Sequence, residues 1–324
     1  MNKKITFVLV LALTAFLVMG AASAGFLDFL GGGGDNTVKI GYLPSDHDAA
    51  LFVADAQGKY AEKNITTKLV QFNNGGDLMT AMASGEVDVG YVGIAPVLSS
   101  VEKGVPVKVI SSAQTEGSGI IVTKDSGINS AADLKGKSIA TPGEASIQYV
   151  LLTYYLKENG LSTNDLNISA MKVPSMNDAL KTKQIDGIVT FQPYVSIAAN
   201  SSDNVVLENS SGILPKHPCC VVVASDDFIK NHEATVKDIV AIHENATKFI
   251  NEKINEGKSS DVVKLLPDDI VSDANLEASS LESFPFISGI NKDFKADVDA
   301  FQKLEVDIGI LNKTIPHDKL YWQA

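Results

Sequence analysis

The sequence predicts an α/β fold of two lobes, each a mostly parallel sheet flanked by helices, with two strands crossing between them. Strand and helix patterns alternate from Val38 onward, which is typical of parallel sheets. A similar helix–strand–proline unit occurs twice. The chain has 324 residues, and a single core stops growing at about 250–300 residues.

The N-terminal residues predict an exported protein. Lys3 and Lys4 precede an apolar run to Gly20, and Ala22-Ser23-Ala24 offers the small residues of a signal-peptidase site. We therefore predict a signal peptide or an N-terminal anchor over residues 1–24, because the run is also long enough to span a bilayer. Residues 25–36 contain four consecutive glycines and predict a flexible tether. Under both alternatives the body lies outside the cytoplasm.

Lobe I is expected to comprise residues 37–118 and 223–324. Its alternating patterns predict strands at 38–42, 67–72, 87–92 and 105–110. Gly76 and Asp77 are expected to cap a helix that ends at Gly85. The C-terminal third has apolar residues at helical spacing, including Val236, Ile239 and Ile250. We expect it to pack against lobe I, with His243 in its core.

Lobe II is expected to comprise residues 119–222. A strand is predicted at 137–141, and Ser146 should cap a helix that ends at Gly160. Ser175 and Asp178 have the spacing of a capping box. Residues 118–124 leave lobe I and residues 218–224 form a return strand. An inserted lobe with two crossing strands predicts a hinged clamshell.

The repeated unit suggests that both lobes share one design. In each copy an apolar residue precedes an aspartate by six positions, Met82 before Asp88 and Leu180 before Asp186. A proline follows each strand, Pro96 and Pro193, where a missing N–H is harmless at the start of a helix.

Ligands of open α/β sheets bind where strands end and helices begin, and helix N-termini bind anions. The loops expected there are rich in Gly, Ser, Asn, Gln and Tyr, although such residues are also ordinary turn and cap residues. The chain has no arginine, so an oxyanion would be held by backbone N–H groups, hydroxyls and a lysine. A formal charge of −12 argues against a nucleic-acid partner.

Four segments resemble the nitrate/taurine/sulfonate class of ABC-transporter solute-binding proteins. They are IGYLPSDHDAALFVADAQGKYAEKNI, EGSGIIVTKDSGINSAADLKGKSIATPGEASIQYVLL, IDGIVTFQPYVSIA and KHPCCVVVAS. The similarity extends from Val38 to about Asn255. It implies a type II periplasmic-binding-protein-like fold and delivery of a solute to an ABC permease and its ATPase.

The family's contact loops map onto 45–47, 93–95, 117–118, 142–146 and 192–194, and residues 73–77 form a further loop at the same edge. Gln192 departs from the family, which often has a glutamate there, and this puts in doubt a ligand whose cation needs a carboxylate. The expected ligand-binding residues are Ser45, His47, Asn73, Gly75, Gly93, Ala95, Gly117, Ser118, Pro142, Ser146, Gln192 and Tyr194.

Metal and enzyme chemistry receive little support. Adjacent Cys219 and Cys220 are expected to be two buried thiols, because a vicinal disulfide is strained. Asp46-His47-Asp48 could seed a metal site with His217, but no further His or Cys is placed by the sequence to complete it. The sequence has no GxSxG elbow, P-loop or HExxH motif. We therefore expect no metal, no cofactor and no catalytic residue.

The sequence predicts an extracytoplasmic receptor for a small anionic or zwitterionic solute. An organosulfonate such as taurine is the first expectation, before nitrate or bicarbonate, and a monomer is the default. The alternative is a binding protein or a fold-related enzyme for a thiamine-pyrimidine precursor. His217 before Cys219-Cys220 faintly resembles the cysteine motif of the pyrimidine-precursor synthase.

Overall fold

The computed structural model describes residues 37–323. Val38–Ala324 form one compact unit. The predicted signal peptide or anchor and the glycine-rich tether lie outside the described residues. Among the helices that are described, none has the length and apolar character needed to cross a bilayer.

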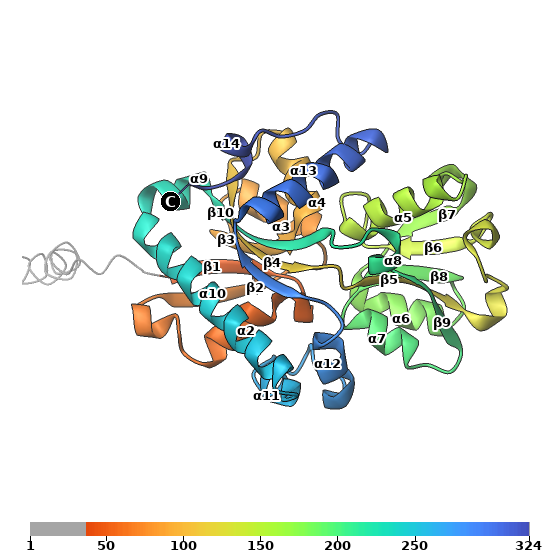
Figure 1. Cartoon of the computed structure of the whole chain (residues 1–324), viewed down its shortest axis with the longest axis horizontal. Coiled ribbons are helices and arrows are strands. Elements are labelled where there is room, and N and C mark those ends of the chain that lie inside the picture. Colours follow the sequence, from red (N-terminus) through yellow and green to blue (C-terminus); the bar gives the residue numbers. More distant parts are fainter. Residues whose placement is uncertain (1–36, 324) are drawn as a thin grey trace, which may run out of the picture. The chain divides into compact units, whose positions relative to one another are not determined.

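Two mixed sheets organise the compact unit (Figure 1). The six-stranded sheet and its helices are called the first lobe, and the five-stranded sheet and its helices the second lobe. In spatial order, the first sheet contains β11 (Phe286–Gly289), β4 (Val107–Thr115), β10 (Pro218–Ser225), β3 (Val89–Gly93), β1 (Thr37–Tyr42) and β2 (Thr66–Gln71). The second contains β7 (Asn167–Ala170), β6 (Ser138–Thr141), β8 (Gly187–Phe191), β5 (Ser118–Thr123) and β9 (Asn204–Asn209).

The chain crosses between the sheets twice, as predicted. It passes from β4 to β5 and returns through β10. Each strand that follows a crossing runs antiparallel to both neighbours: β5 to β8 and β9, and β10 to β3 and β4. The strands β1 and β3, β6 and β7, and β6 and β8 pair in parallel, so both sheets are mixed, where the sequence predicted mostly parallel ones. All of β10 lies in the first sheet, whereas the sequence placed the lobe boundary within this strand, after residue 222.

Helices cover both faces of the first sheet (Figure 1). One core cluster packs β1 against α2 and the long helix α10, and another packs β3 and β10 against α3, α4 and α13. The elements of this lobe are η1 (Asp46–Asp48), α2 (Ala49–Ala56), η2 (Ala61–Lys63), α3 (Gly75–Ala83), α4 (Ile94–Glu102), α9 (Asp226–Asn231), α10 (Glu233–Asn255), α11 (Ser259–Val263), α12 (Ala274–Leu281), α13 (Lys292–Asp307) and α14 (His317–Leu320).

The second sheet is also covered on both faces. Helices α6 and α7 pack on one face, and α5 on the other. The start of α5 also packs into the first lobe's core through Ile147, Val150 and Leu151. The helical elements here are η3 (Lys124–Ser126), η4 (Ala131–Leu134), α5 (Ile147–Glu158), η5 (Thr163–Asp165), α6 (Val173–Lys181), α7 (Tyr194–Ala199) and α8 (Ser210–Ile213).

Helix starts show where the sequence prediction succeeded and failed. Ser146 caps α5 as predicted, since its Oγ accepts the N–H of Tyr149 at 3.2 Å. The cap of α3 is Asn74 rather than Gly76-Asp77, because the Asn74 side chain accepts the Asp77 N–H at 2.9 Å. The capping box at Ser175 is wrong: α6 begins two residues earlier, with a proline in its first turn, where no N–H is needed.

The repeated unit has the same hydrogen bonds in both lobes. Asp88 Oδ2 accepts the N–H of Lys39 at 2.8 Å, and Asp186 Oδ2 accepts the N–H of Ser138 at 2.8 Å. In each copy the aspartate's own N–H donates to the carbonyl of the same partner. Asp88 therefore joins the start of β3 to its parallel neighbour β1, and Asp186 joins the start of β8 to its parallel neighbour β6.

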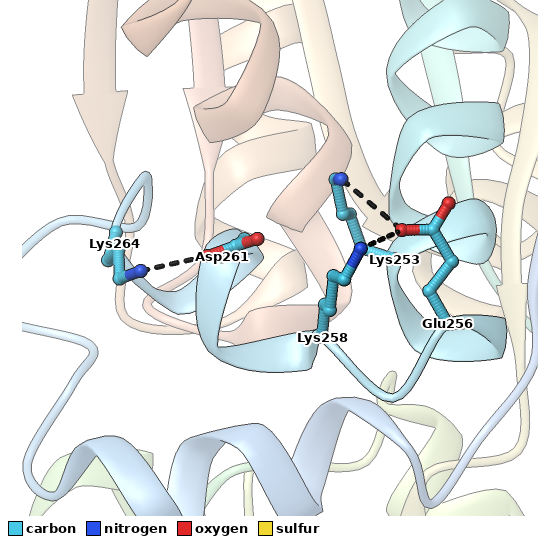
Figure 2. A network of polar contacts seen from close by, with 5 residues as sticks. All are labelled: Lys253, Glu256, Lys258, Asp261 and Lys264. Carbon is cyan, nitrogen blue, oxygen red and sulfur yellow. Dashed lines mark hydrogen bonds and ion pairs between the residues drawn. The ribbon is translucent and has the colours of Figure 1, made fainter.

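The C-terminal third packs largely on the first lobe. His243 of α10 is fully buried, and its ring nitrogens contact the Tyr91 hydroxyl at 3.2 Å and the Ser112 carbonyl at 2.8 Å. The prediction of a core histidine is therefore confirmed. Where α10 leads into α11, an exposed network joins lysines and acids (Figure 2). Glu256 lies between Lys253 and Lys258, at 3.6 and 2.9 Å. Exposed pairs of this kind add little stability.

Candidate functional site

A pocket of about 450 Å³, including space open to solvent, is lined by residues of both lobes. Its polar side chains come mainly from loops between strands and helices, and its apolar ones from Leu43, Pro96, Pro142, Ile147 and Phe191. The remaining lining residues are Ser45, His47, Asp48, Asn74, Gly75, Gly93, Ser146, Gln148, Cys219 and Cys220.

The N-termini of three helices meet at this pocket. Asn74 and Gly75 begin α3, Gly93 precedes α4, and Ser146 precedes α5, and all four line it. The first two helices belong to the first lobe and the third to the second. Free N–H groups and helix dipoles make such ends favourable for an anion. Among the described lining residues none is a lysine, so the expected lysine contact is not present.

His47 lies against both cysteines at the inner side of the pocket. Its Nδ1 is 3.8 Å from Cys219 Sγ and 3.7 Å from Cys220 Sγ, and the two sulfur atoms are 4.0 Å apart. Both thiols are free and buried, as the sequence analysis expected. The expectation that no further cysteine lies near His47 is wrong, because β10 returns beside the η1 loop. These three residues could hold a metal ion.

The pKa values of Cys219, Cys220 and His47 are shifted in different directions. A hydrogen bond from Cys220, followed by the proximity of His47 and His217, holds the pKa of the Cys219 thiol well below its usual range. The same bond to Cys219, together with burial, raises the pKa of Cys220 well above it. Burial opposes the charged form of His47, but Cys219 and the flanking aspartates outweigh this and raise its pKa. Both shifts act in the direction of an ion pair between Cys219 and His47.

Two of the buried acids in this region add little negative charge at neutral pH. Burial raises the pKa of Asp48 to about 8, although Oδ2 accepts the Leu43 N–H at 3.0 Å. Burial also raises the pKa of Asp46 to about 6 and that of Glu277 to about 9. At neutral pH Asp48 and Glu277 are therefore largely uncharged, and the pocket does not repel an anion through them.

Two predicted binding residues instead join the lobes to each other. Ser45 Oγ donates to the Gln192 carbonyl at 2.7 Å, and Gln192 Nε2 donates to Ser283 Oγ at 3.0 Å. Gln192 Oε1 accepts the Ser196 N–H at 3.0 Å, which fixes its side chain on α7. Ser45 and Ser283 belong to the first lobe and Gln192 to the second. These bonds hold the two sides of the pocket together.

Position 117 requires glycine for two reasons, its positive φ and the closeness of His47. Its φ is +75°, and a Cβ there would overlap His47 Nε2. The adjacent crossing segments are bonded to each other, because the Glu116 N–H donates to the His217 carbonyl at 3.2 Å. The crossing between the lobes therefore packs directly on the histidine of the site.

The predicted residues fall into two groups. Six line the pocket: Ser45, His47, Gly75, Gly93, Pro142 and Ser146. The other six lie outside its lining. Asn73 is exposed beside Asn74, Ala95 faces the first lobe's core, and Gly117 lies against His47. Ser118 Oγ accepts a hydrogen bond from Gln148 at 2.9 Å, Gln192 bonds to the first lobe, and the Tyr194 ring lies 5.9 Å from the Phe191 ring.

Most residues missed by the sequence analysis are direct neighbours of predicted ones. Asn74, Ile147, Gln148 and Phe191 each lie one or two positions from a predicted residue. The capping pattern of Asn74 with Asp77 was a readable signal. Cys219 and Cys220 carried no comparable signal, because they contact His47 across 172 and 173 positions of sequence.

Comparison with known proteins places this geometry in a family. The model of the NMT1-like family matches residues 31–266, well over half of the chain. The chain belongs to the NMT1-like family. Its relatives include the taurine-binding periplasmic protein of Escherichia coli, which is 30% identical over 203 residues. That alignment covers 62% of each protein, so the chain spans less than two thirds of this relative.

Two further proteins that are similar to this chain are a binding protein and an enzyme. The alkanesulfonate-binding protein from Xanthomonas axonopodis pv. citri has the same fold, with a TM-score of 0.75 at 20% identity over 89% of this chain and 98% of that one. A 4-amino-5-hydroxymethyl-2-methylpyrimidine phosphate synthase from Aspergillus parasiticus is 25% identical over 233 residues, or 66% of this chain and 67% of the enzyme. The two-lobed binding-protein fold is thus common to the chain and its structural relatives.

Proposed function

We propose that the protein is an exported receptor that binds a small organic anion between its lobes and delivers it to an ABC permease driven by an ATPase. The observation that carries this proposal is the convergence of three helix N-termini on one pocket without a lysine or arginine. Backbone N–H groups at the helix ends then supply the donors for an oxyanion.

An organosulfonate fits the lining better than nitrate. The pocket combines the helix ends with apolar side chains of Leu43, Ile147 and Phe191. A carbon chain can pack on these side chains while the sulfonate oxygens accept from the helix ends. Nitrate offers no apolar part to this surface. The taurine-binding relative supports the same class of ligand.

Closure of the lobes follows from the same geometry. We propose that the two lobes rotate relative to each other about the two crossing segments. The first lobe would comprise residues 37–117 and 218–323, and the second residues 118–217. The hydrogen bonds of Gln192 to Ser45 and Ser283 would form in the closed state. Ligand contacts on α3 and α4 from one side and on α5 from the other would favour that state.

The test is calorimetric titration of the purified protein with taurine, alkanesulfonates, nitrate, bicarbonate and an aminopyrimidine, followed by thermal unfolding with each compound. A bound solute at 100 times its dissociation constant should add about 2.7 kcal/mol to the free energy of unfolding. We expect a sulfonate to give the tightest binding. Binding of the pyrimidine alone would overturn the sulfonate assignment, and turnover of any compound would favour the enzymatic alternative.

A further inference from the structure

The triangle of His47 Nδ1, Cys219 Sγ and Cys220 Sγ has the shape of a coordination site. Its edges are 3.8, 3.7 and 4.0 Å. With metal–sulfur bonds of about 2.3 Å and a metal–nitrogen bond of about 2.0 Å, a trigonal ion needs S···N near 3.7 Å and S···S near 4.0 Å. A tetrahedral ion with the same bonds needs about 3.5 and about 3.8 Å. The observed edges lie within about 0.3 Å of both sets, so the three donor atoms are spaced to bind one ion.

The backbone of β10 directs both cysteines toward the same histidine. Consecutive side chains of a regular strand point to opposite faces. Here the pairing of β10 with β4 shifts register between Pro218 and Cys220 and again between Cys220 and Val221. Such irregularities re-aim side chains. Both sulfur atoms consequently lie within 4.8 Å of His47 Nδ1 and line the pocket.

The surroundings leave the three donors available to a ligand. All three residues are buried, and His47 Nε2 has no hydrogen-bond partner although Nδ1 faces the sulfur atoms. Nothing in the proposed capture of an organic anion requires two thiols. Their position on the pocket lining gives an ion a route from solvent.

We propose that His47, Cys219 and Cys220 form a three-coordinate site for a soft, thiophilic cation, with Cu(I) the best fit. Two sulfur donors with one imidazole select soft ions, and a set of three donor residues suits Cu(I) better than Zn²⁺, which takes four ligands. Coordination displaces the proton of Cys220 and the proton shared by Cys219 and His47 Nδ1, both protons leave to solvent, and no electron is transferred. The site is independent of the sulfonate assignment.

The first experiment is an anaerobic titration of the full chain with Cu(I), in competition with a chromophoric chelator, followed by X-ray absorption spectroscopy. We expect one ion per chain, coordinated by two sulfur atoms and one nitrogen at three-coordinate geometry. Absence of binding, or a first shell of sulfur alone, overturns the proposal without any substitution.

Variants then assign the donors. Cys219→Ser, Cys220→Ser and His47→Gln should each weaken Cu(I) affinity by more than about 100-fold, because loss of an outer-sphere partner alone costs about 10–100-fold. His232→Gln, an exposed histidine outside the pocket, should retain the affinity. Ser146→Ala should also retain it while weakening solute binding, which separates the two proposals. Unchanged affinity in His47→Gln would contradict the site.

Discussion

The two lobes contain the same helix–strand–proline unit, but the residues at the end of its strand have different roles. In both, an aspartate ties the central strand to its parallel neighbour, through Asp88 in one lobe and Asp186 in the other. Gly93 ends this strand in the first lobe and lines the pocket, whereas Gln192 follows it in the second and bonds across to the first lobe. Both copies thus contribute to the binding surface, through Gly93 and Phe191, and the second also contributes to closure through Gln192.

The lobes also differ in buried charge. Among the described residues, burial raises the pKa of four carboxyl groups, and all four lie in the first lobe. They are Asp46, Asp48, Glu277 and Glu305. The described carboxyl groups of the second lobe are exposed or half-buried, and hydrogen bonds from the Asn129 N–H and from Lys183 lower the pKa of Asp133 and Asp125. The stability of the first lobe should therefore depend more strongly on rising pH.

Glu305→Gln gives the largest expected effect. Burial raises the pKa of Glu305 to about 9 from a usual value of 4.5. Since the folded-state pKa is raised, its stabilising contribution is complete below pH 4.5 and is lost as the pH rises toward 9. The neutral variant should gain up to about 3 kcal/mol at pH 7 relative to the parent. Chemical unfolding from pH 5 to 8 measures the difference.

A matched surface variant controls this prediction. Glu256→Gln breaks the exposed network of Figure 2, and its effect on unfolding should be too small to measure. If both variants gave the same pH dependence of stability, the contrast in buried charge would not hold.

Asp88→Ala and Asp186→Ala test whether the repeated unit is equivalent in the two lobes. Each removes the acceptor of a backbone N–H at 2.8 Å. Both should lower the free energy of unfolding by about 1–3 kcal/mol. Comparable losses, measured by denaturant unfolding, are expected. A loss in only one variant would show that the same hydrogen bonds contribute differently to the stability of the two lobes.

Half of the predicted ligand-binding residues line the pocket, and the reason is local. Loops and caps such as Ser146 are encoded by neighbouring residues, so the sequence could place them at the strand ends. The exchange of Asn73 for Asn74 is an error of one position in helix start. The roles of Gln192 and Cys219 depend instead on which segments face each other across the lobes, and no local pattern carries that information.

Ser146→Ala separates capping from ligand binding. The Ser146 hydroxyl caps α5 at the pocket, and Ser225 caps α9 away from it with a bond of 3.1 Å to Phe228 N. Each alanine variant should lose about 1 kcal/mol of stability. Only Ser146→Ala should also weaken solute binding in calorimetry. Equal affinity in both variants would remove the start of α5 from the proposed site.

Ser283→Ala has the smallest expected effect and probes closure. It removes the acceptor of the Gln192 side chain without touching the pocket lining. We expect solute affinity to fall by up to about tenfold, or about 0.5–1.5 kcal/mol, because the closed state loses one hydrogen bond. Small-angle scattering should show a more open ligand-free protein. An unchanged scattering profile and affinity would make this bond irrelevant to closure.

A crystal structure of the complex with the tightest sulfonate of the panel tests the central claim most directly. The account predicts that the sulfonate oxygens accept hydrogen bonds from the N-terminal residues of α3, α4 and α5, with both lobes in contact with the ligand. A ligand bound by one lobe alone, or an anion that avoids these helix ends, would contradict it.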